Sequence, residues 1–229
     1  MNNHVFFITG ASSGIGAATA RAAAAAGYRL VLGARSEERL QELAQELGGP
    51  ERVLAKRCDV TERADQEALA AQALERFGRI DVVFANAGLG SRPGGFSGAD
   101  PENWRAMLMT NVYGAALTLR ATIPALRESH GHLLLTGSAA GRTTIPGSMY
   151  SASKWAVTAI GHGVREELRG SGIRVTLIEP GMVDTPFFDE PKPGVLQTED
   201  VANAVLYAVS QPAHVDVNEV LVRPTPPLE

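Results

Sequence analysis

The sequence of 229 residues alternates short apolar runs with longer amphipathic segments from one end to the other. Each apolar run has the length of one strand, and each amphipathic segment has the length and periodicity of a helix. The predicted strands cover residues 5–9, 30–32, 53–56, 80–85, 133–136, 175–178 and 219–222. The predicted helices cover residues 14–27, 36–47, 61–77, 101–109, 112–129, 149–170 and 198–210.

This order of elements predicts an α/β protein. Strands that are apolar on both faces are typical of a parallel sheet that helices cover on each side. No linker, repeat or low-complexity tract divides the chain. We therefore expect a single doubly wound Rossmann-type domain over residues 1–229, with about seven parallel strands and helices on both faces.

Two irregular segments, residues 88–100 and 181–197, each follow a predicted strand. In folds of this kind ligands bind at the carboxyl edge of the sheet, which is where such segments lie. Together with residues 139–149, we expect these two segments to shape a substrate pocket.

Charge and composition exclude several classes of protein. The chain has 21 basic and 25 acidic residues, so nothing favours a nucleic-acid or anionic-membrane partner. Its single cysteine, Cys58, cannot form an internal disulfide and is compatible with a reducing compartment. We recognise neither a signal peptide nor an apolar stretch long enough to span a membrane, and expect a soluble cytoplasmic protein. His130 and His132 lack a nearby carboxylate or thiol, so we predict no metal site.

A glycine-rich turn follows the first predicted strand. Residues 9–16 read Thr-Gly-Ala-Ser-Ser-Gly-Ile-Gly and lead directly into a predicted helix. Glycines let a pyrophosphate approach the backbone, and the helix presents N–H groups and a positive dipole end to that anion. The spacing differs from the common G-x-G-x-x-G pattern. An ordinary loop with glycine caps is the alternative, but the strand and helix around the turn favour phosphate binding.

The end of the second predicted strand bears on cofactor choice. In dinucleotide-binding folds a carboxylate at this position accepts from the adenosine 2′-hydroxyl, whereas an arginine pairs with a 2′-phosphate. Here the position holds Arg35, and no acidic residue precedes Glu37. We therefore predict NADP(H) rather than NAD(H), with Ser12 and Arg39 as helpers. A surface arginine at the start of a helix is the alternative.

Tyr150 and Lys154 are spaced by four residues at the start of the longest predicted helix. Side chains at this spacing share one helical face. An ammonium near a phenol favours the phenolate, so the tyrosine would exchange a proton with a substrate oxygen near neutral pH. Ser138 closes the fifth predicted strand at the same edge and would hold a carbonyl oxygen. A helical surface pair and a strand-ending serine are the alternatives.

These residues together resemble the short-chain dehydrogenase/reductase family, in its short single-domain branch. The matching motifs cover nearly the whole chain: Thr9-Gly10-x3-Gly14-x-Gly16, Asp59-Val60, Asn86-Ala87-Gly88, Asn111, Ser138, Tyr150-x3-Lys154 and Pro180-Gly181 with Thr185. Residues 215–225 are similar to NADP-dependent 3-hydroxy acid dehydrogenases, serine-type dehydrogenases and carbonyl reductases.

The resemblance implies a role for each matching residue. Tyr150 would be the general acid or base, Lys154 would lower its pKa and hold the nicotinamide ribose, Ser138 would orient the substrate oxygen, and Asn111 would support a proton-relay water. The implied cofactor site comprises Gly10, Ser12, Ser13, Gly14, Ile15, Gly16, Arg35, Asp59, Val60, Asn86, Ala87, Gly88, Tyr150, Lys154, Pro180, Gly181, Val183 and Thr185.

The sequence also departs from the family pattern. Ala85 stands where the family often has a first asparagine of Asn-Asn-Ala-Gly, and Ser138 precedes Tyr150 by 12 residues where 13 is frequent. The region after Thr185 is short, so we expect a small lid and an open pocket. Phe187 and Phe188 would either anchor that lid over an apolar substrate or bury a short helix.

Further pocket candidates come from the three expected substrate segments: Ser91, Arg92, Phe96, Ile145, Met149 and Met182. A substrate carboxylate would meet Arg92 or Arg142, although either arginine could equally be solvated.

The resemblance implies an NADP(H)-dependent oxidoreductase that interconverts an alcohol and a ketone or aldehyde, assembled as a homodimer or homotetramer. One alternative is a non-catalytic NADP(H)-binding sensor or scaffold on the same fold. The other is an epimerase or dehydratase, whose relatives usually carry a longer substrate domain. The sequence does not name the substrate, the direction of reaction or its stereochemistry.

Overall fold

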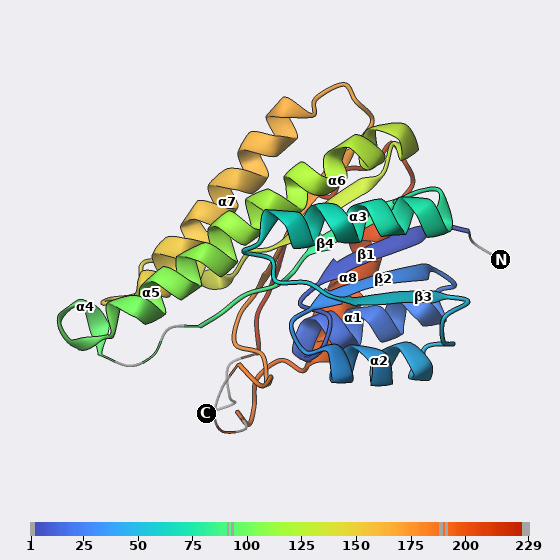
Figure 1. Cartoon of the computed structure of the whole chain (residues 1–229). Coiled ribbons are helices and arrows are strands. Elements are labelled where there is room, and N and C mark those ends of the chain that lie inside the picture. Colours follow the sequence, from blue (N-terminus) through green and yellow to red (C-terminus); the bar gives the residue numbers. More distant parts are fainter. Residues whose placement is uncertain (1–2, 91, 93, 188–189, 191, 226–229) are drawn as a thin grey trace.

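The computed structural model describes residues 3–90, 92, 94–187, 190 and 192–225. In these ranges the strands form one parallel sheet in the order β3-β2-β1-β4-β5-β6-β7 (Figure 1). The strands are β1 (Val5–Thr9), β2 (Arg29–Ala34), β3 (Val53–Arg57), β4 (Val82–Ala85), β5 (His132–Thr136), β6 (Arg174–Pro180) and β7 (Glu219–Val222). The predicted seven-stranded parallel sheet is confirmed.

The helices alternate with these strands along the chain. They are α1 (Gly14–Ala25), α2 (Glu37–Glu46), α3 (Arg63–Phe77), α4 (Gly95–Gly98), α5 (Pro101–Leu108), α6 (Ala115–Ser129), α7 (Met149–Glu167) and α8 (Thr198–Ser210), with a π-helical segment η1 (Met109–Gly114) and a 3₁₀ turn η2 (Ala139–Gly141). None of the helices in the described ranges is long and apolar enough to cross a membrane.

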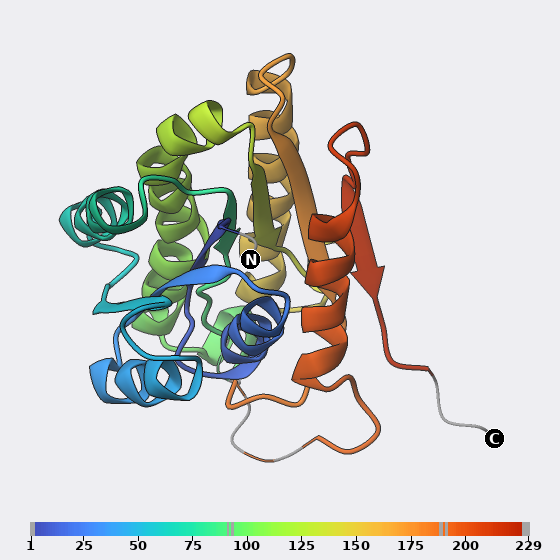
Figure 2. The same cartoon turned by 90° about the vertical axis from the view of Figure 1, so that its right-hand side faces the viewer.

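Two helical layers cover the sheet, as Figures 1 and 2 show. Alternate strand residues point to opposite faces. In β1, Phe6 and Ile8 pack with residues of α1, α2 and α8, whereas Val5 and Phe7 pack with residues of α3, α6 and α7. The doubly wound arrangement is therefore confirmed, and both faces of the central strands are buried.

Some predicted boundaries were wrong. Residues 95–98 form the single turn α4 inside a segment predicted as irregular, where the Gly98 N–H donates to the Gly94 carbonyl. The predicted gap between two helices near residue 110 is instead the continuous segment η1, which joins α5 to α6. Gly114 in η1 leaves room for the Val60 side chain, because a Cβ there would lie 2.8 Å from Val60 Cγ2. This close approach fixes η1 against the end of β3.

Candidate functional site

The glycine turn between β1 and α1 forms a cradle that side chains would fill. Gly10 and Gly14 have φ angles of +65° and +53°, which favour glycine. A Cβ on Gly16 would lie 2.3 Å from the Gly10 carbonyl oxygen and 2.8 Å from Asn86 Nδ2. Ser13 caps α1 without a side-chain hydrogen bond to the helix, so its first N–H groups face this turn. The cradle fits the phosphates of a dinucleotide.

Asn86, just after β4, ties together the ends of three strands. Its Nδ2 donates to the carbonyl of Thr9 at 3.1 Å, and its Oδ1 accepts from Thr136 Oγ1 at 3.1 Å. The Asn86 N–H in turn donates to Thr9 Oγ1 at 3.1 Å. These contacts hold β1, β4 and β5 at one edge and place Ala87 and Gly88 beside the glycine turn. A Cβ on Gly10 would lie 2.8 Å from Ala87 Cα.

The segment after β6 reaches the same turn from the other side. A Cβ on Gly14 would be 3.4 Å from Thr185 Cγ2, so Thr185 lies against the start of α1. Val183 is buried and forms an isolated parallel bridge with Leu196. Gly181 donates to the Val222 carbonyl at 2.7 Å, which holds the Pro180-Gly181 turn beside β7. The structure thus brings the motifs after β1, β4 and β6 to one edge of the sheet.

Arg35 and Asp59 lie at the ends of β2 and β3, toward the other side of the turn. Burial opposes ionisation of Asp59, but hydrogen bonds from Thr61 and the charges of Arg35 and Arg57 lower the pKa of Asp59 overall. Arg35 is exposed at the surface. An exposed guanidinium at this point is able to meet a phosphate.

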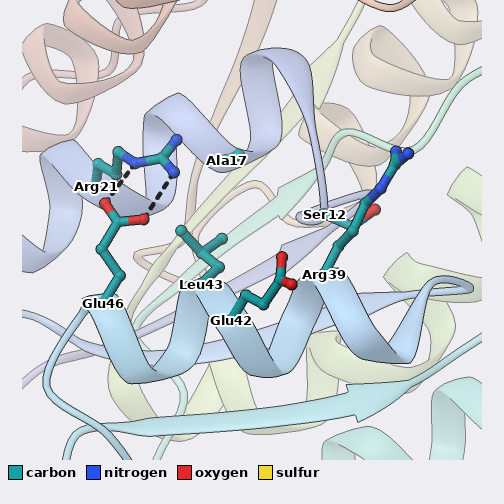
Figure 3. Close-up of a pocket in the computed structure, with 7 residues that line it drawn as sticks. All are labelled: Ser12, Ala17, Arg21, Arg39, Glu42, Leu43 and Glu46. Carbon is teal, nitrogen blue, oxygen red and sulfur yellow. Dashed lines mark hydrogen bonds and ion pairs between the residues drawn. The ribbon is translucent and has the colours of Figure 1, made fainter.

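A groove of about 280 Å³ separates α1 from α2 and continues from this end of the site (Figure 3). Arg39 extends from α2 toward Ser12 in the glycine turn. At the far end of the groove Arg21 and Glu46 form a double hydrogen bond of 2.7 and 2.8 Å. Arg21 is therefore engaged by Glu46, while Arg39 lies on the side nearer the glycine turn.

Tyr150, Lys154 and Ser138 converge at the carboxyl ends of β5 and β6. Lys154 Nζ lies 5.7 Å from the centre of the Tyr150 ring. The Ser138 hydroxyl approaches the Pro180 carbonyl at 3.4 Å and is buried. Burial raises the pKa of Tyr150, and a hydrogen bond with Ser138 lowers it less than burial raises it. Burial outweighs that hydrogen bond, so the Tyr150 hydroxyl keeps its proton at neutral pH in this structure.

Lys154 is itself fully enclosed beneath the site. Its Nζ donates to the Thr136 carbonyl at 2.8 Å. Burial lowers the pKa of Lys154 to about 8. The side chain therefore carries a positive charge at neutral pH and loses it in mildly alkaline solution.

Asn111 is buried in η1, where its side chain is committed to neighbouring groups. Its Oδ1 accepts from the Leu89 N–H at 2.7 Å, and its Nδ2 donates to the Leu89 carbonyl at 2.9 Å and to Ser153 Oγ at 3.1 Å. The side chain therefore joins the segment after β4 to α7. A water relay at this residue would therefore use its main-chain carbonyl rather than its side chain.

The residues expected to line the substrate pocket differ in their contacts and in their exposure. Arg142, expected as a ligand for a substrate carboxylate, instead donates from Nε to Glu179 at 2.7 Å and also pairs with Glu219. Phe96 packs edge-on against Trp104 rather than against Tyr150. Ile145 and Met182 are exposed, Met149 begins α7, and Arg92 is exposed near Asn103. Ser91 and Phe188 lie outside the described residues.

Sequence reasoning missed Glu179 and Thr136. Glu179 is 1% exposed at the end of β6, immediately before Pro180. A carboxylate in an otherwise apolar strand must be paired, and this signal was visible in the sequence. Thr136 bonds to both Asn86 and Lys154 through two different atoms, a role that no sequence pattern reveals.

Within the described ranges, no group of three or more His, Cys, Asp and Glu side chains is arranged to hold a metal ion. His132 is buried on β5 and contacts Thr176 Oγ1 at 2.7 Å. Burial lowers the pKa of His132 to about 3. It is a core residue, with its ring held by a neighbouring strand.

Comparison with known proteins identifies the family of the chain. The family model for short chain dehydrogenases matches residues 4–194. The chain is 39% identical to an uncharacterized oxidoreductase of Staphylococcus saprophyticus, and the match covers 98% of each chain. It is 35% identical to an alcohol dehydrogenase from the archaeon Thermococcus sibiricus, solved in complex with 5-hydroxy-NADP; the TM-score is 0.89, with 99% of this chain and 98% of that chain covered.

A serine dehydrogenase from Escherichia coli is also similar. It is 33% identical with a TM-score of 0.88, and the match covers 96% of this chain and 97% of that chain. These matches extend over the glycine turn, the Tyr150 and Lys154 helix and the strands that hold them. The chain therefore belongs to the short-chain dehydrogenase/reductase family of oxidoreductases.

Proposed function

We propose that the protein interconverts an alcohol and a ketone or aldehyde with NADP(H). The observation that carries this proposal is the convergence of Tyr150, Ser138 and Lys154 beside the glycine cradle, on strand ends that Asn86 joins. A proton-transferring phenol, a hydroxyl donor and a buried cation at the mouth of a dinucleotide cradle suit carbonyl reduction.

Each side chain has a defined task in this proposal. When bound, the nicotinamide supplies or accepts the hydride. In reduction the Tyr150 hydroxyl donates its proton to the carbonyl oxygen, and in oxidation the phenolate takes that proton back. Ser138 donates a hydrogen bond to the same oxygen and lowers the cost of the developing charge. Its burial removes competing water from that contact.

Lys154 and Asn111 support this exchange. One N–H of Lys154 is fixed on Thr136, and the others would bind the ribose next to the nicotinamide. The positive charge of Lys154 favours the phenolate form of Tyr150 when the hydroxyl has given up its proton. The main-chain carbonyl of Asn111 would hold a water that returns protons from solvent.

The choice of NADP(H) rests on Arg35. Its guanidinium is exposed at the end of β2, where no carboxylate precedes Glu37 to accept from a ribose hydroxyl. Ser12 and Arg39, at the near end of the groove in Figure 3, would add contacts to a 2′-phosphate. The archaeal relative solved with 5-hydroxy-NADP gives this assignment support from a similar chain.

We also propose a homodimer or homotetramer. Trp155 on α7 is 47% exposed and Tyr113 in η1 is 45% exposed. Aromatic side chains of this size are enriched where proteins associate. Light scattering of the purified protein would give the mass of the assembly, and a monomer would contradict the proposal.

The experiment that tests the function is NADPH oxidation with a panel of ketones, aldehydes and 3-oxo acids. Replacing Tyr150 by Phe removes the proton donor while keeping the ring, so turnover should fall at least about 100-fold. Tyr207→Phe on α8, where the side chain is exposed, is the matched control and should leave turnover unchanged.

Two results would contradict the proposal. Full turnover in Tyr150→Phe would remove the proton-transfer role from this residue. An unmodified protein that binds NADPH tightly but oxidises it with no member of the panel would favour the non-catalytic sensor instead.

A further inference from the structure

Phe187 stands directly beside the proposed proton donor. Its ring centre lies 5.7 Å from that of Tyr150, with the two planes at 66°, an edge-to-face contact. Phe187 is nevertheless 44% exposed, so the rest of the described chain leaves much of this side chain uncovered. A substrate whose oxygen reaches the Tyr150 hydroxyl would therefore lie close to the Phe187 ring.

The Phe187 ring also contacts the segment after β4. A Cβ on Gly90 would lie 2.5 and 2.7 Å from two ring carbons of Phe187. Real side chains essentially never come so close, so the ring occupies the place that any residue larger than glycine would need. Gly90 and Phe187 therefore fit each other as a pair from two separate segments.

Short contacts hold Phe187 at this position. Its N–H donates to Thr185 Oγ1 at 3.3 Å, and Thr185 lies against Gly14 in the glycine turn. Asp184 makes two hydrogen bonds to the segment that precedes α8. Its N–H donates to the Leu196 carbonyl at 2.8 Å, and its Oδ1 accepts from the Lys192 N–H at 3.1 Å. The ring is thus fixed to the same backbone that forms the cofactor cradle.

Two cations close to the proposed reaction centre, Arg142 and Lys154, are already engaged. Arg142 is bound to two carboxylates, and Lys154 donates into the strand edge at Thr136. A carboxylate on the substrate would therefore lie against an aromatic ring and lose its hydration without a partner from these two side chains. Burying an anion in this way is unfavourable, whereas an apolar or aromatic group gains by covering the ring.

From these contacts we propose that Phe187, supported by Gly90, determines substrate specificity: it selects ketones and aldehydes with an apolar or aromatic substituent and disfavours 3-oxo carboxylates. This inference rests on the proposed carbonyl reduction and names the substrate class for it. Phe187 would act by contact with the substrate and would take no part in proton transfer.

The test compares kcat/KM for three substrates with NADPH: an aryl methyl ketone, an aliphatic methyl ketone and a 3-oxo carboxylate. In the unmodified protein, kcat/KM for the aryl ketone should be at least about tenfold higher than kcat/KM for the 3-oxo carboxylate. Phe187→Ala should reduce that ratio about tenfold, mainly through a higher KM for the aryl ketone. Its kcat for the aliphatic ketone should change only a few-fold, because Tyr150 and Ser138 remain.

Two further variants make the result specific. Gly90→Ala adds one methyl group beneath the ring, displaces Phe187 and should change the substrate ratio in the same direction without removing the aromatic group. Tyr207→Ala removes an exposed aromatic side chain on α8, outside the three expected substrate segments, and should leave the ratio unchanged.

The failures of the two proposals are distinguishable. Turnover of all three substrates with ratios that Phe187→Ala and Gly90→Ala leave unchanged would overturn the specificity proposal alone. A preference for the 3-oxo carboxylate in the unmodified protein would also overturn it. Absence of turnover with every substrate in every variant would overturn the proposed reaction and this inference together.

Discussion

Arg142 and Glu179 form an ion pair between the two segments that carry the proposed reaction centre, with Arg142 Nε 2.7 Å from Glu179 Oε1. Arg142 lies four residues after Ser138, and Glu179 immediately precedes Pro180, whose carbonyl accepts from the Ser138 hydroxyl. Glu219 on β7 joins the same guanidinium. The pair therefore connects the segment after β5 with the ends of β6 and β7.

Replacing Arg142 by Met should destabilise the protein by about 3–5 kcal/mol, because it leaves the buried Glu179 carboxylate without its partner. Burial already raises the pKa of Glu179, and Arg142 is the main group that opposes this rise. Urea unfolding would measure the loss. Arg63→Met, which breaks the exposed pair with Glu67, is the control and should leave the free energy of unfolding almost unchanged.

The double variant Arg142→Met with Glu179→Gln should recover part of this stability, since the remaining side chain is neutral. A loss in Arg142→Met no larger than that in Arg63→Met would show that solvent already reaches the Glu179 carboxylate.

The contrast between this pair and the strands shows what a sequence can predict. The alternation of apolar and amphipathic segments predicts the sheet because each strand's burial depends on its own residues. Arg142 and Glu179 are 37 positions apart, and their contact depends on how β5 and β6 pair in register. Nothing local to Arg142 distinguishes a structural ion pair from a substrate ligand, which is why the sequence left its role open.

The glycine turn gives a second prediction. Gly16→Ala places a Cβ 2.3 Å from the Gly10 carbonyl oxygen, so the turn must open and the cradle for the phosphates must change shape. We expect the KM for NADPH to rise at least about tenfold, by analogy with other displacements of about 1 Å at a binding site. Gly163→Ala on α7 is the control, because a Cβ there meets nothing within 4 Å.

Calorimetry of NADPH binding would separate affinity from catalysis. The control should bind normally and gain slightly in stability, since alanine favours a helix over glycine by about 1 kcal/mol. Equal affinities in Gly16→Ala and Gly163→Ala would remove the cradle from the cofactor site.

Arg35 gives a prediction about cofactor preference. Arg35→Glu replaces a cation with an anion where a 2′-phosphate is expected, so the KM for NADPH should rise at least about tenfold while that for NADH changes little. Initial rates with both cofactors would measure the ratio. Arg127→Glu is the matched charge reversal. Arg127 lies near the end of α6, before the amino end of β5 and away from the carboxyl edge, so the KM values for NADPH and NADH should stay unchanged. An equal rise for both cofactors in Arg35→Glu would contradict the assignment to the phosphate.

Tyr150 illustrates what a short motif leaves open. The spacing of four residues predicts that Tyr150 and Lys154 share one helical face. In the structure, Lys154 Nζ lies 5.7 Å from the centre of the Tyr150 ring. Burial raises the pKa of Tyr150, and the Phe187 ring that packs against it comes from a distant part of the chain. Burial of this kind is a property of the folded chain and has no signature in a five-residue motif.

Lys154 predicts an alkaline limit to activity. Because burial lowers its pKa to about 8, the ammonium should lose its charge as the pH rises through this value. The rate of carbonyl reduction should fall over the same range, because neutral Lys154 holds the cofactor ribose and favours the phenolate less well. A pH profile of kcat/KM would record this fall as its alkaline limb. Lys154→Arg stays charged above pH 8, so the limb should move upward even if the maximal rate is lower.

Lys56→Arg, on an exposed part of β3, is the matched control and should keep the limb near pH 8. An unchanged limb in Lys154→Arg would assign the transition to another group.

His132 predicts sensitivity to acid. Its pKa is about 3 in the folded chain against 6.5 for an ordinary histidine, because burial disfavours the charged ring. Between these values the unfolded state binds one more proton at this residue than the folded state. The stability contributed by neutral His132 is therefore fully present above pH 6.5 and is lost as the pH falls. The largest slope from one residue is about 1.4 kcal/mol per pH unit.

His132→Gln keeps a hydrogen-bonding side chain and removes this titration. The free energy of unfolding, measured with urea from pH 7 to pH 4, should fall less steeply in this variant, even if its value at pH 7 is lower. His214→Gln is the control because His214 is exposed, and its slope should match that of the unmodified protein. Equal slopes in all three proteins would mean that His132 is protonated in the folded state, with water reaching the ring beside Thr176.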